Sequence, residues 1–158
     1  MPSRGAGQID EGQYETVEDF DFMDDVCCLI SSEMIEHIGP YDEDFFFDYE
    51  ETEWNFRMRK KNYRIVYNPK MKVWHRIHGS TKGSRYSRIP EYYHWKGKIL
   101  FNYKTKESKD YLSFLFSFLF KEVPIHWLVL IKNRKTSLIF YNLKGIISGI
   151  KRVLELKA

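Results

Sequence analysis

The sequence lacks two features that a secreted, disulfide-stabilised module needs. Its 158 residues contain only two cysteines, Cys27 and Cys28. Because the two are adjacent, they can form neither a disulfide framework nor a four-ligand zinc site, and we interpret them as buried packing residues rather than nucleophiles. Residues 1–21 contain no apolar run that resembles a signal peptide. We therefore expect a protein of the reducing cytoplasm.

The chain is rich in aromatic residues, and its charge is divided unevenly between two segments. Phe, Tyr and Trp make up 17% of the residues, too many for a disordered protein and enough for one compact domain. Residues 1–58 hold 17 acidic and two basic side chains, a net charge of −15, whereas residues 59–158 hold 23 basic and five acidic ones, a net charge of +18. This asymmetry indicates an acidic site region joined to a basic surface for an anionic partner, which could be a nucleic acid, a phosphorylated small molecule or a membrane.

The pattern of apolar, turn and charged residues predicts an α/β fold in three segments. Residues 1–13 are rich in Gly, Ser and Gln, and we expect a flexible lead-in over 1–19. Within 20–104, the expected elements are a buried strand within 22–32, a short helix over 32–38, an acidic aromatic loop over 41–47, a helix from Asp48 to about Lys61, strands over 63–67 and 71–74, a polar loop over 75–87 and a helix over 91–103. Gly39 and Pro40 end the first helix, Asp48 and Glu51 predict a capping box, and Asn62 fits a left-handed residue after the second helix.

The third segment, 105–158, is apolar and basic. Residues 111–120 and 123–131 form two apolar runs that a charged pair separates, and a proline lies in the second run. A membrane-spanning helix needs about 20 predominantly apolar residues, so the interruptions favour one or two interfacial or core helices. Between Ile139 and Leu154, apolar residues recur at spacings of three and four with lysines between them. This is a basic amphipathic helix, which is typical of segments that lie on anionic membranes.

The densest group of carboxylates, at residues 50–53, lies at the start of the second predicted helix. On a helix, Glu50, Glu53 and Arg57 share one face, and Glu53 can pair with Arg57 four residues later. Glu51 lies in the first turn, near the positive end of the helix dipole. Crowded carboxylates raise one another's pKa, whereas an arginine or a metal lowers it, so such a cluster can tune a general base. The spacing alone also fits a solvated acidic turn with one ordinary ion pair.

A second group of chemically active residues follows the strand predicted over 71–74. The imidazole of His75 at the end of a strand is a candidate metal ligand, and carboxylates upstream could complete a site for Mg²⁺ or Mn²⁺. Ser80 and Thr81, in a turn flanked by basic residues, could hold phosphate oxygens. The alternative is an ordinary surface histidine beside a basic loop. The Asp-x-Asp pairs at 19–21 and 42–44 follow no buried apolar strand, so we assign them no metal–diphosphate role.

In their order and spacing, these pieces resemble the C-terminal half of the catalytic domain of family 2 glycosyltransferases, which have the GT-A fold. The similarity is greatest to the rhamnosyltransferase-like branch. It covers residues 20–82 and extends more weakly to Tyr92 and Tyr93. The matching stretches are 28–33, 38–39, 41–46, 49–53, Arg57, 62–69, 73–75 and 79–81. No stretch of this sequence resembles the family's nucleotide-binding half.

The resemblance implies a partial GT-A mixed sheet and an inverting sugar transfer. Glu51 stands where the family has its catalytic base, with Glu50 beside it. His75 matches a downstream histidine that helps to bind Mg²⁺ or Mn²⁺ on the diphosphate in some members. The resemblance implies that Ser80 and Thr81 bind substrate. Glu53 and Arg57 belong to the same substrate-binding group, and their main role would be to orient the helix.

The expected partners follow from this resemblance and from the basic tail. They are a nucleotide-diphosphate sugar, a glycan or lipid-linked acceptor, the inner face of the cell membrane to which the protein binds peripherally, and a nucleotide-binding half supplied upstream or by a second chain. The alternative is a non-catalytic membrane-surface or partner-binding module derived from the same fold. Nucleic-acid binding is a weaker hypothesis, because the apolar residues of the basic segment follow helical stripes and long runs rather than an exposed stacking platform.

Overall fold

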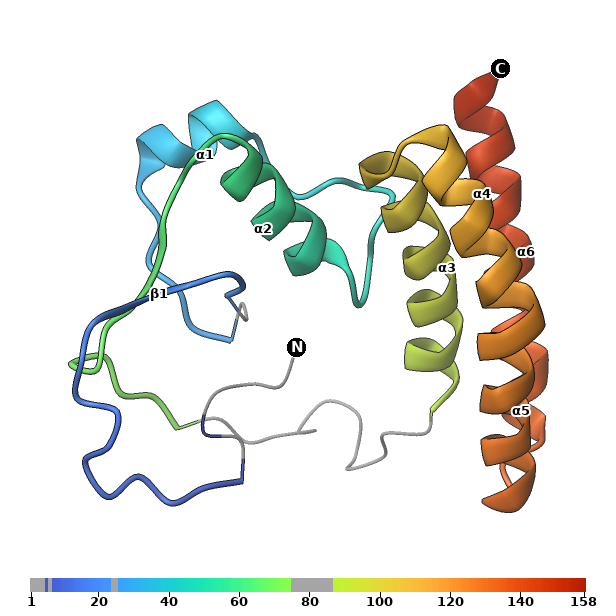
Figure 1. The fold of residues 1–158 in the computed structure, drawn as a ribbon, viewed down its shortest axis with the longest axis horizontal. Helices are drawn as coiled ribbons and strands as arrows, with labels where there is room; N and C mark the ends of the chain where they lie inside the picture. Colours follow the sequence, from blue (N-terminus) through green and yellow to red (C-terminus); the bar gives the residue numbers. More distant parts are fainter. Residues whose placement is uncertain (1–4, 6, 24–25, 75–86) are drawn as a thin grey trace.

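A computed structural model describes residue 5 and residues 7–23, 26–74 and 87–158. These residues form a mostly helical molecule with one small sheet (Figure 1). The elements are β1 (Glu18–Phe20), α1 (Ser32–Ile38), α2 (Glu50–Lys60), β2 (Ile65–Tyr67), α3 (Arg88–Thr105), α4 (Ser108–Ser117), the π-helix η1 (Phe118–Glu122), α5 (Val123–Lys132) and α6 (Ser137–Lys157). The expected combination of helices and strands is therefore present, with helices dominant.

The sheet of the described residues is smaller than the partial GT-A sheet that the sequence led us to expect. Strands β1 and β2 run antiparallel, with Asp19 opposite Val66 at the centre of the pair. The strand expected over 63–67 is confirmed, in shorter form, as β2. Among the described residues, no strand forms within 22–32 or at 71–74, so both of those predictions were wrong. Leu29 is 82% exposed, so this segment is not the buried strand that was expected.

Helices α1 and α2 begin and end close to the predicted residues. The hydroxyl of Ser31 accepts a hydrogen bond from the backbone N–H of Met34 and so caps α1, and Gly39 ends that helix with a φ of 82°. Asn62 follows α2 in the predicted left-handed conformation. The predicted capping box at Asp48 does not form, because Tyr49 is the residue before α2 and no side chain caps that helix end.

Helices α3 to α6 form a helical layer beside the sheet and α2 (Figure 1). Helix α6 approaches α3 closely at two glycines: a Cβ at Gly145 would lie 2.3 Å from the carbonyl oxygen of Tyr92, and one at Gly149 would lie 3.1 Å from that of Lys96. The helices expected over 91–103 and 139–154 are thus confirmed, and no larger residue fits at Gly145 without moving a backbone.

A buried polar network links three helices of this layer. Asn142 of α6 is fully buried, and its side-chain oxygen accepts a 2.8 Å hydrogen bond from the indole N–H of Trp127 in α5. The carboxylate of Glu91 in α3 accepts hydrogen bonds from Trp95 at 2.9 Å and from the amide of Asn142 at 3.4 Å, and its Oε1 lies 2.6 Å from Nε2 of His126. Buried polar groups cost little when each finds a partner, so the network fixes the helix register.

Helices α4, η1 and α5 form one continuous helix of 25 residues, Ser108–Lys132. Its buried side chains are spaced by seven, five and seven residues: Tyr111, Phe118, Val123 and Leu130. The step of five falls at the π-helix, where the backbone N–H of Val123 donates to the carbonyl of Phe118. A π-turn takes an additional residue per turn, so it keeps the second pair on the same face as the first. The helix is long and apolar enough to cross a membrane, which on its own is weak evidence for a span.

Candidate functional site

The acidic motif occupies the first turn of α2. Glu50 and Glu51 are half-buried there, and Glu53 is buried with 5% of its surface exposed. The N-terminal end of a helix carries a partial positive charge, which favours the ionised form of a carboxyl in the first turn. The structure places Glu50 and Glu51 at this N-terminal end of α2, which is the end nearer to the helical layer (Figure 1).

Glu53 and Arg57 attach α2 to the end of α1. The guanidinium Nε of Arg57 donates to both carboxylate oxygens of Glu53, at 2.8 and 2.9 Å, as the spacing predicted. The other nitrogens of Arg57 donate to the carbonyl oxygens of Ile38 and Pro40. Burial raises the pKa of the Glu53 carboxyl, although Arg57 opposes that shift. This pair therefore holds the turn after α1 against α2.

Two further side chains of α2 fix its position. The indole N–H of Trp54 donates a 2.9 Å hydrogen bond to the carbonyl of Gly39. The amide of Asn55 is 2% exposed and bonds both backbone groups of Met23, accepting from N–H at 3.0 Å and donating to C=O at 2.8 Å. These contacts tie α2 to residues 15 and 32 positions earlier in the chain, so the direction of its acidic end is well defined.

A strained turn leads into the acidic motif and packs on α3. Asp48 and Tyr49 both have left-handed backbone angles, with φ of 65° and 75°. The carboxylate of Asp48 lies 2.5 Å from Nδ1 of His94, and the ring of Tyr49 packs against His94 and Phe101. A Cβ at Gly97 would lie 3.0 Å from the Tyr49 ring. Strained non-glycine residues persist where the surroundings hold them, and they concentrate at functional sites.

His94 is a residue of this region that the sequence did not indicate. It lies 46 positions after Asp48, within an aromatic stretch that predicts a helix and nothing more. Burial also raises the pKa of the Tyr49 phenol, with a further contribution from the negative charge of Asp48. The turn at 48–49 thus joins the acidic motif to the helical layer.

The acidic loop before α2 is neutralised by the helical layer. Nζ of Lys104 donates 2.5 Å hydrogen bonds to the carboxylates of Asp42 and Asp44, and Nε of Arg152 donates to Asp44 at 2.6 Å. Burial raises the pKa of the Asp44 carboxyl, but these hydrogen bonds outweigh it and hold the pKa below its usual range. Phe45 from the same loop is buried in the core of the helical layer. In the described residues, the loop therefore connects α2 to the helical layer through ion pairs and a buried aromatic ring.

Several predicted site residues lie elsewhere or outside the described residues. His75, Ser80 and Thr81 fall within 75–86 and so lie outside them. In the parts of the chain that the structure describes, no three His, Cys, Asp or Glu side chains are placed to hold a metal. Metal binding through His75 therefore stays a prediction. Asp19, from the first Asp-x-Asp pair, accepts hydrogen bonds from Nε and Nη2 of Arg64 at 2.9 and 3.0 Å.

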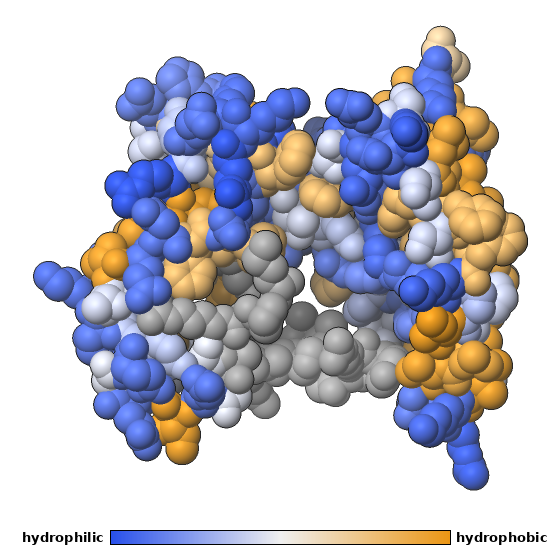
Figure 2. Space-filling view, in the orientation of Figure 1, coloured by the Kyte–Doolittle hydropathy of each residue, from blue (hydrophilic) through white to orange (hydrophobic). Residues whose placement is uncertain are grey.

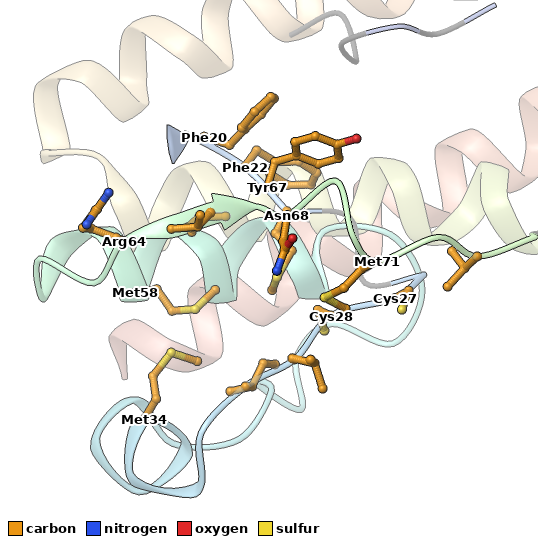
Figure 3. A pocket seen from close by; sticks show the side chains of 16 residues that line it. Phe20, Phe22, Cys27, Cys28, Met34, Met58, Arg64, Tyr67, Asn68 and Met71 are labelled. Atoms are coloured by element: carbon orange, nitrogen blue, oxygen red, sulfur yellow. The ribbon is translucent and has the colours of Figure 1, made fainter. Parts of the chain in front are cut away.

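The cysteines were expected to be buried, and this was wrong. Cys27 is exposed and Cys28 is half-buried, and both line an apolar pocket of about 480 Å³. Figure 3 shows the pocket between β2, the segment around the cysteines, and the side chains of Met34 and Met58. Among the described residues, the segment from 26 to 30 forms no strand, and it borders this pocket beside β2.

Comparisons of the chain with protein-family models, with curated proteins and with solved structures found no match.

Proposed function

We propose that this chain carries the acceptor side and the catalytic base of an inverting family 2 glycosyltransferase with the GT-A fold. The observation that carries the proposal is the placement of the motif: Glu50 and Glu51 lie at the N-terminal end of a helix that the side chains of Trp54, Asn55 and Arg57 hold in place. A general base needs an ionised carboxylate that is held in a fixed position. The resemblance in motif order supplies the reaction class.

In the proposed reaction, the carboxylate of Glu51 accepts the proton of an acceptor hydroxyl. The acceptor oxygen then forms a bond to the anomeric carbon of the sugar. The bond between that carbon and the diphosphate breaks, and the nucleotide diphosphate leaves with the electron pair. Ser80, Thr81 and the neighbouring basic residues would bind diphosphate oxygens, and a divalent metal held with the help of His75 would stabilise the negative charge of the leaving group.

The nucleotide-diphosphate sugar would be bound by a half-domain supplied upstream or by a second chain. The exposed apolar residues around the sheet are consistent with such a partner: Val66 of β2 is 46% exposed and Val73 is 56% exposed, both beside the apolar pocket. A sheet with unpaired edges and an exposed apolar face gains stability from added strands. An immunoblot of the protein in its own cells tests this directly, since a band near twice the expected mass would show that the half-domain precedes Met1.

The proposed base is tested by complementation in cells from which the gene has been deleted. Wild type, Glu51→Gln and Glu51→Asp are compared, with Glu36→Gln as a control that removes an exposed carboxylate of α1. We expect Glu51→Gln to abolish the glycan that wild type restores, with partial restoration by Glu51→Asp and full restoration by Glu36→Gln. Restoration by Glu51→Gln at the wild-type level would overturn the assignment.

The alternative function is a non-catalytic module at the membrane surface. The apolar surface of the helical layer supports it equally well, because binding to a membrane requires no sugar chemistry. The same complementation separates the two hypotheses. A non-catalytic module would complement equally well with Glu51→Gln and would lose function when its apolar surface is altered.

A further inference from the structure

The continuous helix of α4, η1 and α5 exposes a stripe of large apolar side chains. Five of them are between 53% and 71% exposed: Leu112, Phe116, Phe120, Ile125 and Leu128. They are spaced by four, four, five and three residues, so the step of five again falls across the π-helix. We call these five residues the exposed stripe. Exposed apolar patches of this kind mark surfaces that a protein partner or a membrane covers.

The π-helix is what makes the stripe continuous. In an unbroken α-helix, a step of five residues would turn the side chain of Ile125 about 100° further round the axis than a step of four. The π-turn absorbs that additional residue, and the backbone bond from Val123 to Phe118 shows it directly. Both the buried side and the exposed stripe therefore run the whole length of the helix. A core helix of a soluble protein needs a continuous buried side but no continuous exposed apolar stripe.

Most charges of the C-terminal helices are positive. Between Ser108 and Lys157 the chain has nine basic and three acidic residues, a net charge of +6. Of the acidic residues, Glu122 is paired with Lys98 of α3 and Glu155 with Arg152. Interfaces between proteins are depleted of lysine at their cores, whereas helices that bind anionic lipid carry lysine and arginine beside their apolar face. Figure 2 shows apolar surface along the edge formed by the C-terminal helices, with polar surface at its two ends.

We infer that the exposed stripe lies in the boundary between headgroups and acyl chains of an anionic bilayer, with the helix axis parallel to the membrane plane. The opposite side of the helix cannot meet lipid, because Phe118 and Leu130 are at most 1% exposed against the rest of the helical layer. Lys121 is exposed near the middle of the helix, where a spanning orientation would place it at the bilayer centre. This inference makes specific the membrane location that belongs to the proposed function, and it does not depend on sugar transfer.

The test is flotation of the full chain with vesicles of phosphatidylcholine alone or of an equimolar mixture with phosphatidylglycerol. Phe116→Ser and Leu128→Ser alter the stripe, and Phe46→Ser is a matched control, because Phe46 is 71% exposed and Phe116 is 68% exposed. We expect wild type and Phe46→Ser to bind the anionic vesicles equally, and each stripe variant to bind at least about tenfold more weakly. Added salt should weaken the binding of all forms.

Equal binding by the stripe variants, or equal binding to both vesicle types, would overturn the inference. So would an absence of vesicle binding combined with dimers that Phe116→Ser dissociates, since a second copy would then cover the stripe. Circular dichroism of each variant confirms that the fold is retained. Glu51→Gln should bind vesicles like wild type, so a failure of the proposed chemistry and a failure of the lipid surface give different results.

Orientation is measured with spin labels placed singly at Leu128→Cys and Lys121→Cys, in a chain whose two native cysteines are replaced by serine. On anionic vesicles, the label at 128 should collide with oxygen in the acyl region, and the label at 121 should collide with a water-soluble nickel complex. Burial of both labels in the acyl region would show a spanning helix and would contradict the parallel orientation.

Discussion

The carboxylate oxygen Oδ2 of Asp48 lies 2.5 Å from Nδ1 of His94, across 46 residues of sequence. This contact fixes the left-handed turn before α2 to the helical layer, so it determines how the acidic motif is placed relative to α3. Asp tolerates the left-handed region better than most residues, which suits it to this turn. The rest of the turn is held by the Tyr49 ring over Gly97.

Replacing His94 with alanine should loosen this turn. We expect His94→Ala to lower the free energy of unfolding by about 1 kcal/mol, the usual net contribution of one hydrogen bond. Urea unfolding followed by circular dichroism measures this. His37→Ala is a comparison on the surface of α1, where the ring contacts the hydroxyl of Tyr63 instead. If His94→Ala also lowered activity while urea stability was unchanged, the histidine would act on the substrate rather than on the turn.

The two glycines of α6 should differ in their tolerance of alanine. Gly145→Ala would place a Cβ 2.3 Å from the backbone oxygen of Tyr92, and α3 and α6 must then separate. We expect a loss of about 3 kcal/mol at Gly145. At Gly149, the nearest atoms lie at 3.1 Å, and the gain in helix propensity of about 1 kcal/mol offsets part of the strain. Thermal unfolding of both variants should therefore rank Gly145→Ala as the less stable; the reverse order would show that the helices do not approach as described.

Asn142→Leu should destabilise the helical layer through unpaired polar groups rather than through a loss of volume. The indole N–H of the partly buried Trp127 would lose its acceptor, the side-chain oxygen of the fully buried Asn142. An unsatisfied buried donor costs about 2 kcal/mol. The double variant Asn142→Leu with Trp127→Phe removes both partners, and it should recover part of that loss in urea unfolding. No recovery would mean that Asn142 acts mainly through Glu91.

Stability should fall in acid through Asp44. Its carboxyl has a lower pKa in the folded chain than in the unfolded chain, so ionised Asp44 stabilises the fold above about pH 4, and that stabilisation disappears as the pH falls through the folded pKa. We expect Asp44→Asn to cost about 2 kcal/mol at neutral pH and progressively less below about pH 4. Glu43→Gln, an exposed neighbour in the same loop, is the control for the change in net charge. A loss for Asp44→Asn that does not vary with pH would rule out the ion pairs as its cause.

Local rules in the sequence predicted local structure well. Ser31 and Gly39 bound α1, Asn62 takes the left-handed position after α2, and Glu53 pairs with Arg57, because each depends on residues at most four positions apart. The strand expected around Leu29 did not form, since a strand depends on a partner elsewhere in the chain. Asp48 contacts His94 and does not cap the start of α2. No local pattern in the sequence relates two residues 46 positions apart. The charged pair Lys121 and Glu122 left one helix or two open, and the structure has one continuous helix with a π-turn at this point.

The π-turn also determines where this chain can be shortened. Deletion of one residue between 119 and 122 would leave a step of four across the former π-helix, which an ordinary α-helix accommodates, so both faces of the helix would stay aligned. Deletion of one residue from α4 or α5 would instead turn one half of the helix by about 100° relative to the other. The same helix therefore has one short interval that tolerates a change in length and two flanking stretches that do not.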